Sequence, residues 1–319
     1  MIQVQNVQQQ PSQDVREQLY SQLEDYMGLS STKKKMDSSE KSGGTTLKRK
    51  SSEQSSSSSS SKALSKNTLA IKVNGKTVKG SAQNIVGRVV EAEMGASFRE
   101  EALKAQAVAA YTYIRYNNQK GTIPSLPAKS SVSAKVEDAV EQVIGEALYY
   151  QGEYINATYC ASNAGNSVDS ENVWGGYLPY LRSVESPGDT TLKAYGAVKR
   201  FSEEEIAQYI EENLDVDPYD YSDPDEWFED EEYINGRYVD SIRVCGRRLS
   251  GREVREELME FALPSVAFEV EYDDGEFIFT TYGYGHGVGM SQQGADYFAQ
   301  RGWDYEEILT HYYTGVTLK

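Results

Sequence analysis

The chain has 319 residues, 39% of them hydrophobic and 25% charged, which is typical of a globular protein with room for one large domain. Its net charge of −17 argues against a protein that follows the phosphates of a nucleic acid, so we expect no nucleic-acid partner. Two cysteines and two histidines exclude a multi-disulfide scaffold, a four-cysteine zinc site and a three-histidine metal centre.

The first 66 residues differ in composition from the rest. They contain 17 serines, including an unbroken run over 55–61, and few large apolar residues after Met27. Such a segment cannot bury enough surface to offset its chain entropy, so we predict a disordered tether over 1–66. Four-residue apolar spacing within 13–28 predicts a marginal helix, with a short amphipathic helix for a partner as the alternative. The sequence as given shows neither a signal peptide nor the roughly 20 apolar residues of a membrane span.

From residue 67 the pattern predicts a single α+β domain over 67–319, with a buried alanine-rich helix and β-hairpins. Asn74-Gly75 within 71–78 predicts the first hairpin, and the β-branched run over 85–90 predicts a strand. Ser97 and Glu100 have capping-box spacing, which predicts a helix start at EEALKAQAVAAYTYIRY. The small side chains of this helix allow close approach by neighbours, so we predict that it lies at the centre of the domain.

Later elements follow from periodicity and turn residues. Apolar spacing over 136–144 predicts a second helix, and hairpins are predicted over 148–159 and over 268–281. Glycine-rich loops follow at 161–166 and 282–295, and a last helix is predicted over 306–313. Residues 203–233 hold 15 acidic and no basic residues, which predicts a solvated insertion or helix face, with metal or partner docking as the alternative.

The acids near the predicted strand-to-helix junction are the first candidates for chemistry. They are Glu91, Glu93, Glu100 and Glu101. On a strand, Glu91 and Glu93 would face the same side. A general acid needs a carboxyl that an apolar or crowded setting keeps protonated. The competing interpretation is a group of exposed acids at a strand end and a helix start.

The loop over 282–295 is the second candidate, because five glycines surround His286, Ser291 and Gln292. Alternating glycines allow positive φ and close approach to a ligand, although a purely structural tight loop explains them equally well. A Ser291 nucleophile beside His286 lacks the G-x-S-x-G elbow. A mixed metal site from Cys160, His286 or His311 has no support from spacing, since lone cysteines and histidines usually serve packing.

Three segments resemble the motifs of the stage II sporulation protein D family, which also includes amidase-enhancer proteins. GRVVEAEMGASFREEALKAQAVAAYTY resembles the opening motif and SENVWGGYLPYLRSVESPGD the central one. LSGREVREEL followed by YGYGHGVGMSQQGADYFAQRGWDYEEILTHYYTG resembles the C-terminal motif. The resemblance covers roughly 68–319 in the family's order.

The resemblance implies a lytic transglycosylase that cleaves the β-1,4 bond after N-acetylmuramic acid in peptidoglycan glycan strands, with strands stripped of stem peptides preferred. It also implies extracytoplasmic action at the cell wall during engulfment, beside a partner amidase and a membrane protein. The glutamate of the "EM" pair, Glu93, is then the catalytic acid. The glycine-rich loop would line the glycan groove, with His286, Ser291, Gln292 and Tyr282 as substrate-binding residues. A non-catalytic amidase enhancer and a degenerate scaffold are the alternatives.

Three positions depart from the family pattern, one of them Ala161, which stands where the central motif has serine or threonine. Tyr111 stands where the family usually has arginine, and Arg115, one helical turn on, is a candidate substitute. Cys160 stands where the central motif has histidine. Some relatives bind zinc near this region, so Cys160 is a weak candidate ligand, but the sequence offers no obvious second or third ligand and no other cofactor is expected.

Overall fold

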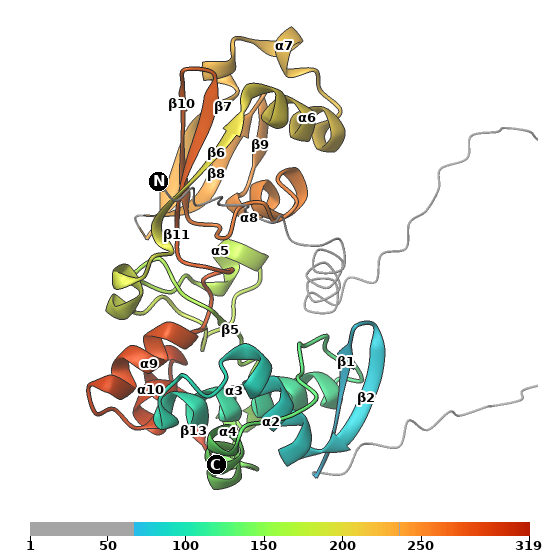
Figure 1. Ribbon diagram of the computed structural model, residues 1–319, viewed down its shortest axis with the longest axis vertical. Helices are drawn as coiled ribbons and strands as arrows, with labels where there is room; N and C mark the ends of the chain where they lie inside the picture. The colour runs from blue at the N-terminus through green and yellow to red at the C-terminus, as the bar shows by residue number, and fades with distance from the viewer. Residues whose placement is uncertain (1–66, 236) are drawn as a thin grey trace, which may run out of the picture.

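The computed structural model describes residues 67–235 and 237–319, which form two lobes stacked along the long axis of the molecule (Figure 1). The helical lobe contains the helices around α3, and the sheet lobe contains the strands from β6 to β11. Each lobe has its own cluster of buried apolar side chains. The mixture of helix and sheet confirms the α+β prediction, while the predicted tether and the marginal helix over 13–28 lie outside the described residues.

The alanine-rich helix is the centre of the helical lobe, as predicted. Its alanines at 105, 107, 109 and 110 are buried, so neighbouring helices pack against its backbone. The helices of this lobe are α2 (Ala82–Glu93), α3 (Glu100–Gln119), α4 (Ala134–Val143), α9 (Gln292–Gln300) and α10 (Tyr305–Tyr312). The helices predicted over 136–144 and 306–313 are thus confirmed as α4 and α10.

Small antiparallel ladders edge this lobe. The first predicted hairpin is confirmed as β1 (Thr68–Val73) and β2 (Lys76–Ser81), which turn at Asn74-Gly75 with positive φ at both residues. The hairpin predicted over 148–159 is shorter, with β3 (Leu148–Tyr150) and β4 (Glu153–Tyr154) joined by β13 (Thr317–Leu318).

The strand predicted over 85–90 is wrong, because these residues belong to helix α2. Ser81 caps the helix by accepting a hydrogen bond from the Asn84 amide at 3.3 Å. Ile85, Val86 and Val89 are fully buried, and their spacing covers one face of a helix. Burial against α3 and α4 therefore outweighs the modest strand preference of β-branched residues.

The predicted capping box at Ser97 and Glu100 is also wrong, although the helix does begin at Glu100. Arg99 is the N-cap residue and makes no side-chain cap. Its backbone amide instead donates to the Asp296 carboxylate of α9 at 2.7 Å, and its guanidinium pairs with the same carboxylate. A helix that is distant in the sequence but adjacent in space thus fixes the start of α3.

The sheet lobe consists of two three-stranded antiparallel sheets with short helices at their edges (Figure 1). One sheet contains β6 (Tyr195–Ser202), β10 (Phe268–Asp273) and β11 (Glu276–Tyr282), and the other β7 (Phe228–Ile234), β8 (Tyr238–Val244) and β9 (Arg247–Leu249). The hairpin predicted over 268–281 is confirmed as β10 and β11. Aromatic side chains fill the core: Trp227 stacks on Phe277 with ring centroids 5.5 Å apart.

The acidic segment 203–233 takes part in this core. It forms α6 (Glu203–Leu214), the short helices α7 (Pro218–Tyr221) and η2 (Pro224–Glu226), and most of β7. Ile206, Ile210 and Trp227 are fully buried, whereas most of the acidic side chains between them are exposed. The charge therefore lies on the solvated side of elements whose apolar side completes the lobe.

Irregular chain connects the lobes. It contains α5 (Ser170–Trp174), η1 (Pro187–Thr191) and a parallel pair formed by β5 (Tyr159–Cys160) and β12 (Met290–Ser291). The sheet lobe contributes α8 (Gly251–Glu253) and the π-helical turn η3 (Val254–Leu258) to this connecting region. In the described part of the chain, the helices are too short or too polar to cross a membrane.

Candidate active site

A cavity of about 260 Å³ lies where the two lobes meet. Segments far apart in sequence line it: the end of α2, the loops around β5 and α5, the turn η3, and the glycine-rich loop before α9. The residues that matter below are Glu93, Cys160, Trp174, Arg255, Glu256, His286 and Gln292. Its walls are mainly apolar, with these few polar groups among them.

Glu93 is the last residue of α2, so the helix end holds its carboxyl at the cavity. Burial raises the pKa of this carboxyl from 4.5 to about 7. The Gln292 side-chain amide donates a hydrogen bond to Glu93 Oε2 at 3.1 Å, which partly offsets that rise in pKa. Because Oε2 accepts from Gln292, the acidic proton belongs on Oε1. Glu93 is therefore a carboxyl that both holds and releases a proton near neutral pH.

The other three acids of the predicted group have structural partners. Glu91 accepts hydrogen bonds from the backbone amide of Ser133 at 3.0 Å and from its hydroxyl at 2.7 Å, at the start of α4. Glu100 and Glu101 pair with Lys104 on the same helix. Since α2 is a helix, residues two apart point about 200° away from each other, so Glu91 and Glu93 do not share a side.

His286 lies in the cavity wall and is neutral. Burial and the nearby Arg255 guanidinium lower its pKa to about 3, although a hydrogen bond to the backbone of Tyr159 acts in the opposite direction. The Val288 amide donates to His286 Nδ1 at 3.0 Å, which leaves the ring proton on Nε2. The imidazole ring packs on Trp174 at a centroid distance of 5.1 Å.

The alternating glycines of the loop pack against the protein itself. A Cβ at Gly289 (φ +78°) would lie 2.2 Å from the Thr158 carbonyl oxygen, and one at Gly287 (φ +76°) would lie 2.3 Å from the Tyr238 ring. The expected close approach is thus to the β5 region and to β8, not to a ligand. This packing brings His286 and Gln292 to the cavity.

Ser291 does not reach the cavity, which contradicts its predicted role in substrate binding. It is fully buried, donates to Asp189 Oδ1 at 2.8 Å and accepts from the Gly294 amide at 2.8 Å. It is the N-cap of α9. The hydroxyl is occupied by these bonds, and the structure gives it no contact with His286.

Arg115 and Tyr282 also lie away from the cavity lining. Arg115 packs over the Tyr154 ring beside Tyr111, on the side of α3 that faces the small hairpin. Tyr282 donates to Glu269 at 2.9 Å in the sheet lobe. Neither position therefore supports the expected contact with substrate, and Arg115 does not take the place of the missing arginine at 111 in this cavity.

Cys160 lines the cavity but does not fit a zinc site. Burial and the Asp189 carboxylate raise the pKa of its thiol to about 12 in the metal-free chain. Its sulfur lies 3.0 Å from Asn163 Oδ1. His311 bonds the Glu185 carbonyl oxygen elsewhere, at 2.7 Å. Over residues 67–235 and 237–319, no three Cys, His, Asp or Glu side chains come together as metal ligands would.

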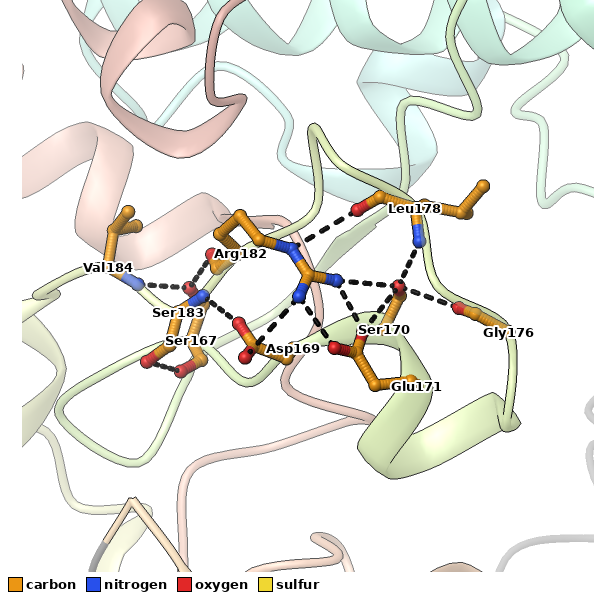
Figure 2. Close-up of polar contacts among 9 residues, drawn as sticks. All are labelled: Ser167, Asp169, Ser170, Glu171, Gly176, Leu178, Arg182, Ser183 and Val184. Atoms are coloured by element: carbon orange, nitrogen blue, oxygen red, sulfur yellow. Dashed lines mark hydrogen bonds and ion pairs between the residues drawn. The ribbon is translucent and has the colours of Figure 1, made fainter.

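A polar network holds the α5 loop that carries Trp174 (Figure 2). Arg182 makes a bidentate pair with Glu171, which lowers the pKa of that carboxyl to about 2. Ser170 accepts from the Leu178 amide at 2.9 Å and donates to the Gly176 carbonyl oxygen at 2.8 Å. These bonds join residues 170–171, at one end of the loop, to residues 176–182 at the other end. They give the central motif a structural role next to the cavity.

Comparison with known proteins identifies the family. A model described as stage II sporulation protein matches residues 76–150. Stage II sporulation protein D of Bacillus amyloliquefaciens is 32% identical over 274 residues, which cover 76% of this chain and 77% of that protein. The protein of the same name from Bacillus subtilis strain 168 is 31% identical over 278 residues, with the same coverage. The chain belongs to the stage II sporulation protein D family.

A further relative of this chain carries a different name. The amidase enhancer of Bacillus subtilis strain 168 is 28% identical over 290 residues, covering 72% of this chain and 39% of that protein. Together these relatives support a cell-wall function in sporulation for the family member described here.

Four of the predicted site residues come together in this cavity: Glu93, Cys160, His286 and Gln292. Sequence reasoning missed Arg255 and Glu256 of η3, which line the cavity from the sheet lobe, and Trp174 of α5. All three lie in the segments that carry the family resemblance. The motif match could have indicated that these segments matter, but not that their side chains face Glu93.

Proposed function

We propose that this protein is a lytic transglycosylase that cleaves the MurNAc-β-1,4-GlcNAc bond of peptidoglycan strands and leaves a 1,6-anhydroMurNAc end. The observation that carries the proposal is Glu93, a carboxyl with a pKa near 7 in a cavity between two lobes. Family membership supports a cell-wall substrate. The site of action is then the cell wall outside the membrane, with a partner amidase and a membrane protein of the engulfment machinery.

One carboxyl suffices for this reaction. Glu93 donates its Oε1 proton to the glycosidic oxygen as the bond to the anomeric carbon breaks, which releases the GlcNAc end as an alcohol. The resulting carboxylate then takes the proton of the muramic acid C6 hydroxyl. The C6 oxygen bonds to the anomeric carbon, closes the anhydro ring and returns Glu93 to its starting state. Because water is not the nucleophile, the second carboxylate of a hydrolase is not needed.

The cavity supports both halves of this cycle. Gln292 fixes Glu93 by donating to Oε2, so the reacting oxygen keeps one orientation. The other cavity carboxyl, Glu256, lies between two arginines, with Arg252 Nε at 3.9 Å and an Arg255 nitrogen at 3.6 Å. Burial raises the pKa of Glu256 as well, but both arginines act in the opposite direction. We therefore assign proton transfer to Glu93, which has no such cation beside it among the described residues.

The test is the release of anhydromuramic ends from purified glycan strands by the full chain alone. Glu93→Gln keeps the shape and an acceptor for Gln292, but it cannot donate a proton. General acid–base catalysis contributes about 10²–10⁴-fold, so turnover should fall at least that far. Glu91→Gln is the matched control and should retain activity, because Glu91 faces Ser133. Near wild-type release by Glu93→Gln, or loss of activity only in Glu91→Gln, would refute the assignment.

The 28% identity to an amidase enhancer favours one alternative, a non-catalytic module that binds the cell wall and stimulates an amidase. The same assay separates the two functions. An enhancer releases no anhydromuramic ends by itself, and the Glu93→Gln variant would stimulate a partner amidase as well as the unmodified protein does.

A further inference from the structure

A rigid aromatic side chain stands exposed beside the cavity. Tyr177 is 65% exposed, the highest value among the large hydrophobic side chains that the structure describes. It follows Trp174, which lines the cavity, by three residues in the α5 loop, so the Cα atoms of the two residues are at most about 11 Å apart. A single exposed tyrosine is ordinary on a protein surface, and this one is distinguished by how firmly it is held.

The backbone on both sides of Tyr177 is bonded to one hydroxyl group (Figure 2). Ser170 Oγ donates to the Gly176 carbonyl oxygen at 2.8 Å and accepts from the Leu178 amide at 2.9 Å. Arg182 Nη2 donates to the same hydroxyl oxygen at 3.1 Å. The peptide groups before and after Tyr177 are therefore fixed, which sets the direction in which its side chain leaves the backbone.

A fixed cation holds one face of the ring. The Arg182 guanidinium lies 4.4 Å from the centre of the Tyr177 ring, in the range of a cation–π contact. That guanidinium is itself held by its bidentate pair with Glu171 and by the Leu178 carbonyl oxygen, which accepts from Arg182 Nε at 3.2 Å. The opposite face of the ring stays in water. A flat apolar surface that is already immobile loses little conformational entropy when a ligand covers it.

The surface between Tyr177 and the cavity is open. Gly175 and Gly176 form it, both are exposed, and a Cβ at either position would meet no atom within 4 Å. The cavity itself has a volume of about 260 Å³, below the roughly 300–1,000 Å³ of sites that enclose a whole small ligand. A glycan strand bound at Glu93 therefore continues outside the cavity, and the path past Trp174 crosses this stretch without side chains to reach Tyr177.

We propose that Tyr177 is an outlying glycan-binding subsite, on which a sugar of the bound strand stacks a few units away from the bond that Glu93 cleaves. This inference rests on the proposed function. A pyranose ring presents C–H groups on one face, which pack on the negative face of an aromatic ring while the sugar hydroxyls stay hydrated at its edge. The subsite thus favours strands that are long enough to reach Tyr177 over short oligosaccharides.

Binding of glycans of different length tests this subsite separately from catalysis. The protein is the full chain carrying Glu93→Gln, which does not cut the probes, and the probes are peptide-free oligosaccharides from a disaccharide up to long strands. A sugar that covers one face of a tyrosine ring takes roughly 50 Å² of apolar surface out of water, which corresponds to about 5–10-fold in affinity. Tyr177→Ala in this background should lower the affinity for long strands by that factor and leave the affinity for the shortest oligosaccharides unchanged.

Two further substitutions in the same background complete the experiment. Tyr177→Phe keeps the ring, so it should bind every probe as the Glu93→Gln protein does, and loss of the long strands in this variant would contradict stacking. Tyr219→Ala is the matched control, because Tyr219 is 54% exposed but lies on α7 in the sheet lobe, and its removal should change no affinity. Thermal melts check that each variant folds.

The outcomes separate this inference from the proposed function. Long strands that bind Tyr177→Ala as tightly as its parent overturn the subsite and leave the exposed ring to a protein partner. Equal losses for the shortest and the longest glycans overturn it too, because Tyr177 would then act at the cavity. Either result leaves the function standing if the unmodified protein releases anhydromuramic ends. A length-dependent loss in Tyr177→Ala without any such release would overturn the function and leave Tyr177 as a glycan-binding residue.

Discussion

The elevated pKa of Glu93 should make the protein less stable at the pH where it is active. The carboxyl has a pKa of about 7 in the folded chain and 4.5 as its ordinary value. Between these values the folded chain keeps a proton that the unfolded chain releases. The free energy of unfolding therefore falls as pH rises from 4.5 to 7, and the loss is complete above pH 7.

The magnitude follows from the difference in pKa. At about 1.36 kcal/mol for each unit, burial of the ionised carboxyl lowers the stability at pH 8 by about 3 kcal/mol. Glu93→Gln cannot ionise, so we expect it to gain that amount over the unmodified protein between pH 4.5 and pH 8. For a domain of this size, the difference in melting temperature should grow by roughly 6–12 °C over that interval.

The assay is thermal unfolding of both proteins from pH 4.5 to pH 8, followed by circular dichroism or calorimetry. All other titrating groups are common to the two proteins, so their effects cancel in the difference. Glu91→Gln is the control of opposite sign: it weakens the two hydrogen bonds from Ser133 and should lower stability at pH 8 by about 1 kcal/mol. If the difference in melting temperature between Glu93→Gln and the unmodified protein stays constant from pH 4.5 to pH 8, the reasoning is wrong.

Two other substitutions test the packing around the site. Ala109→Leu should lower the free energy of unfolding by about 1–3 kcal/mol in denaturant titration, because Ala109 is fully buried in α3; unchanged stability would contradict its central position. Ser291→Ala should lower it by about 1–3 kcal/mol, since it removes the hydrogen-bond partner of Asp189 Oδ1 and of the Gly294 amide in the buried interior. A melt like that of the unmodified protein would show that the Ser291 cap contributes little.

Local patterns sufficed for the elements whose determinants are local. The β1–β2 hairpin follows from Asn74-Gly75, and β10–β11 from Asp274-Gly275, because positive φ at these turn residues fixes the register of short antiparallel pairs. Helix α4 follows from apolar spacing along one face. Glu93 was found by the resemblance of EAEM to a family motif, since spacing alone did not separate it from its neighbours.

Tertiary packing decided what these patterns left open. It made 85–90 a helix, started α3 through Asp296, and buried Ser291 as a cap. It also set the chemistry of the site: the pKa of Glu93 depends on burial by distant segments, and Arg255 reaches the same cavity from the other lobe. The sequence determined the turns, the apolar faces of the helices and the family. Only the folded chain determined which carboxyl is desolvated, because desolvation depends on all the segments that pack around that carboxyl.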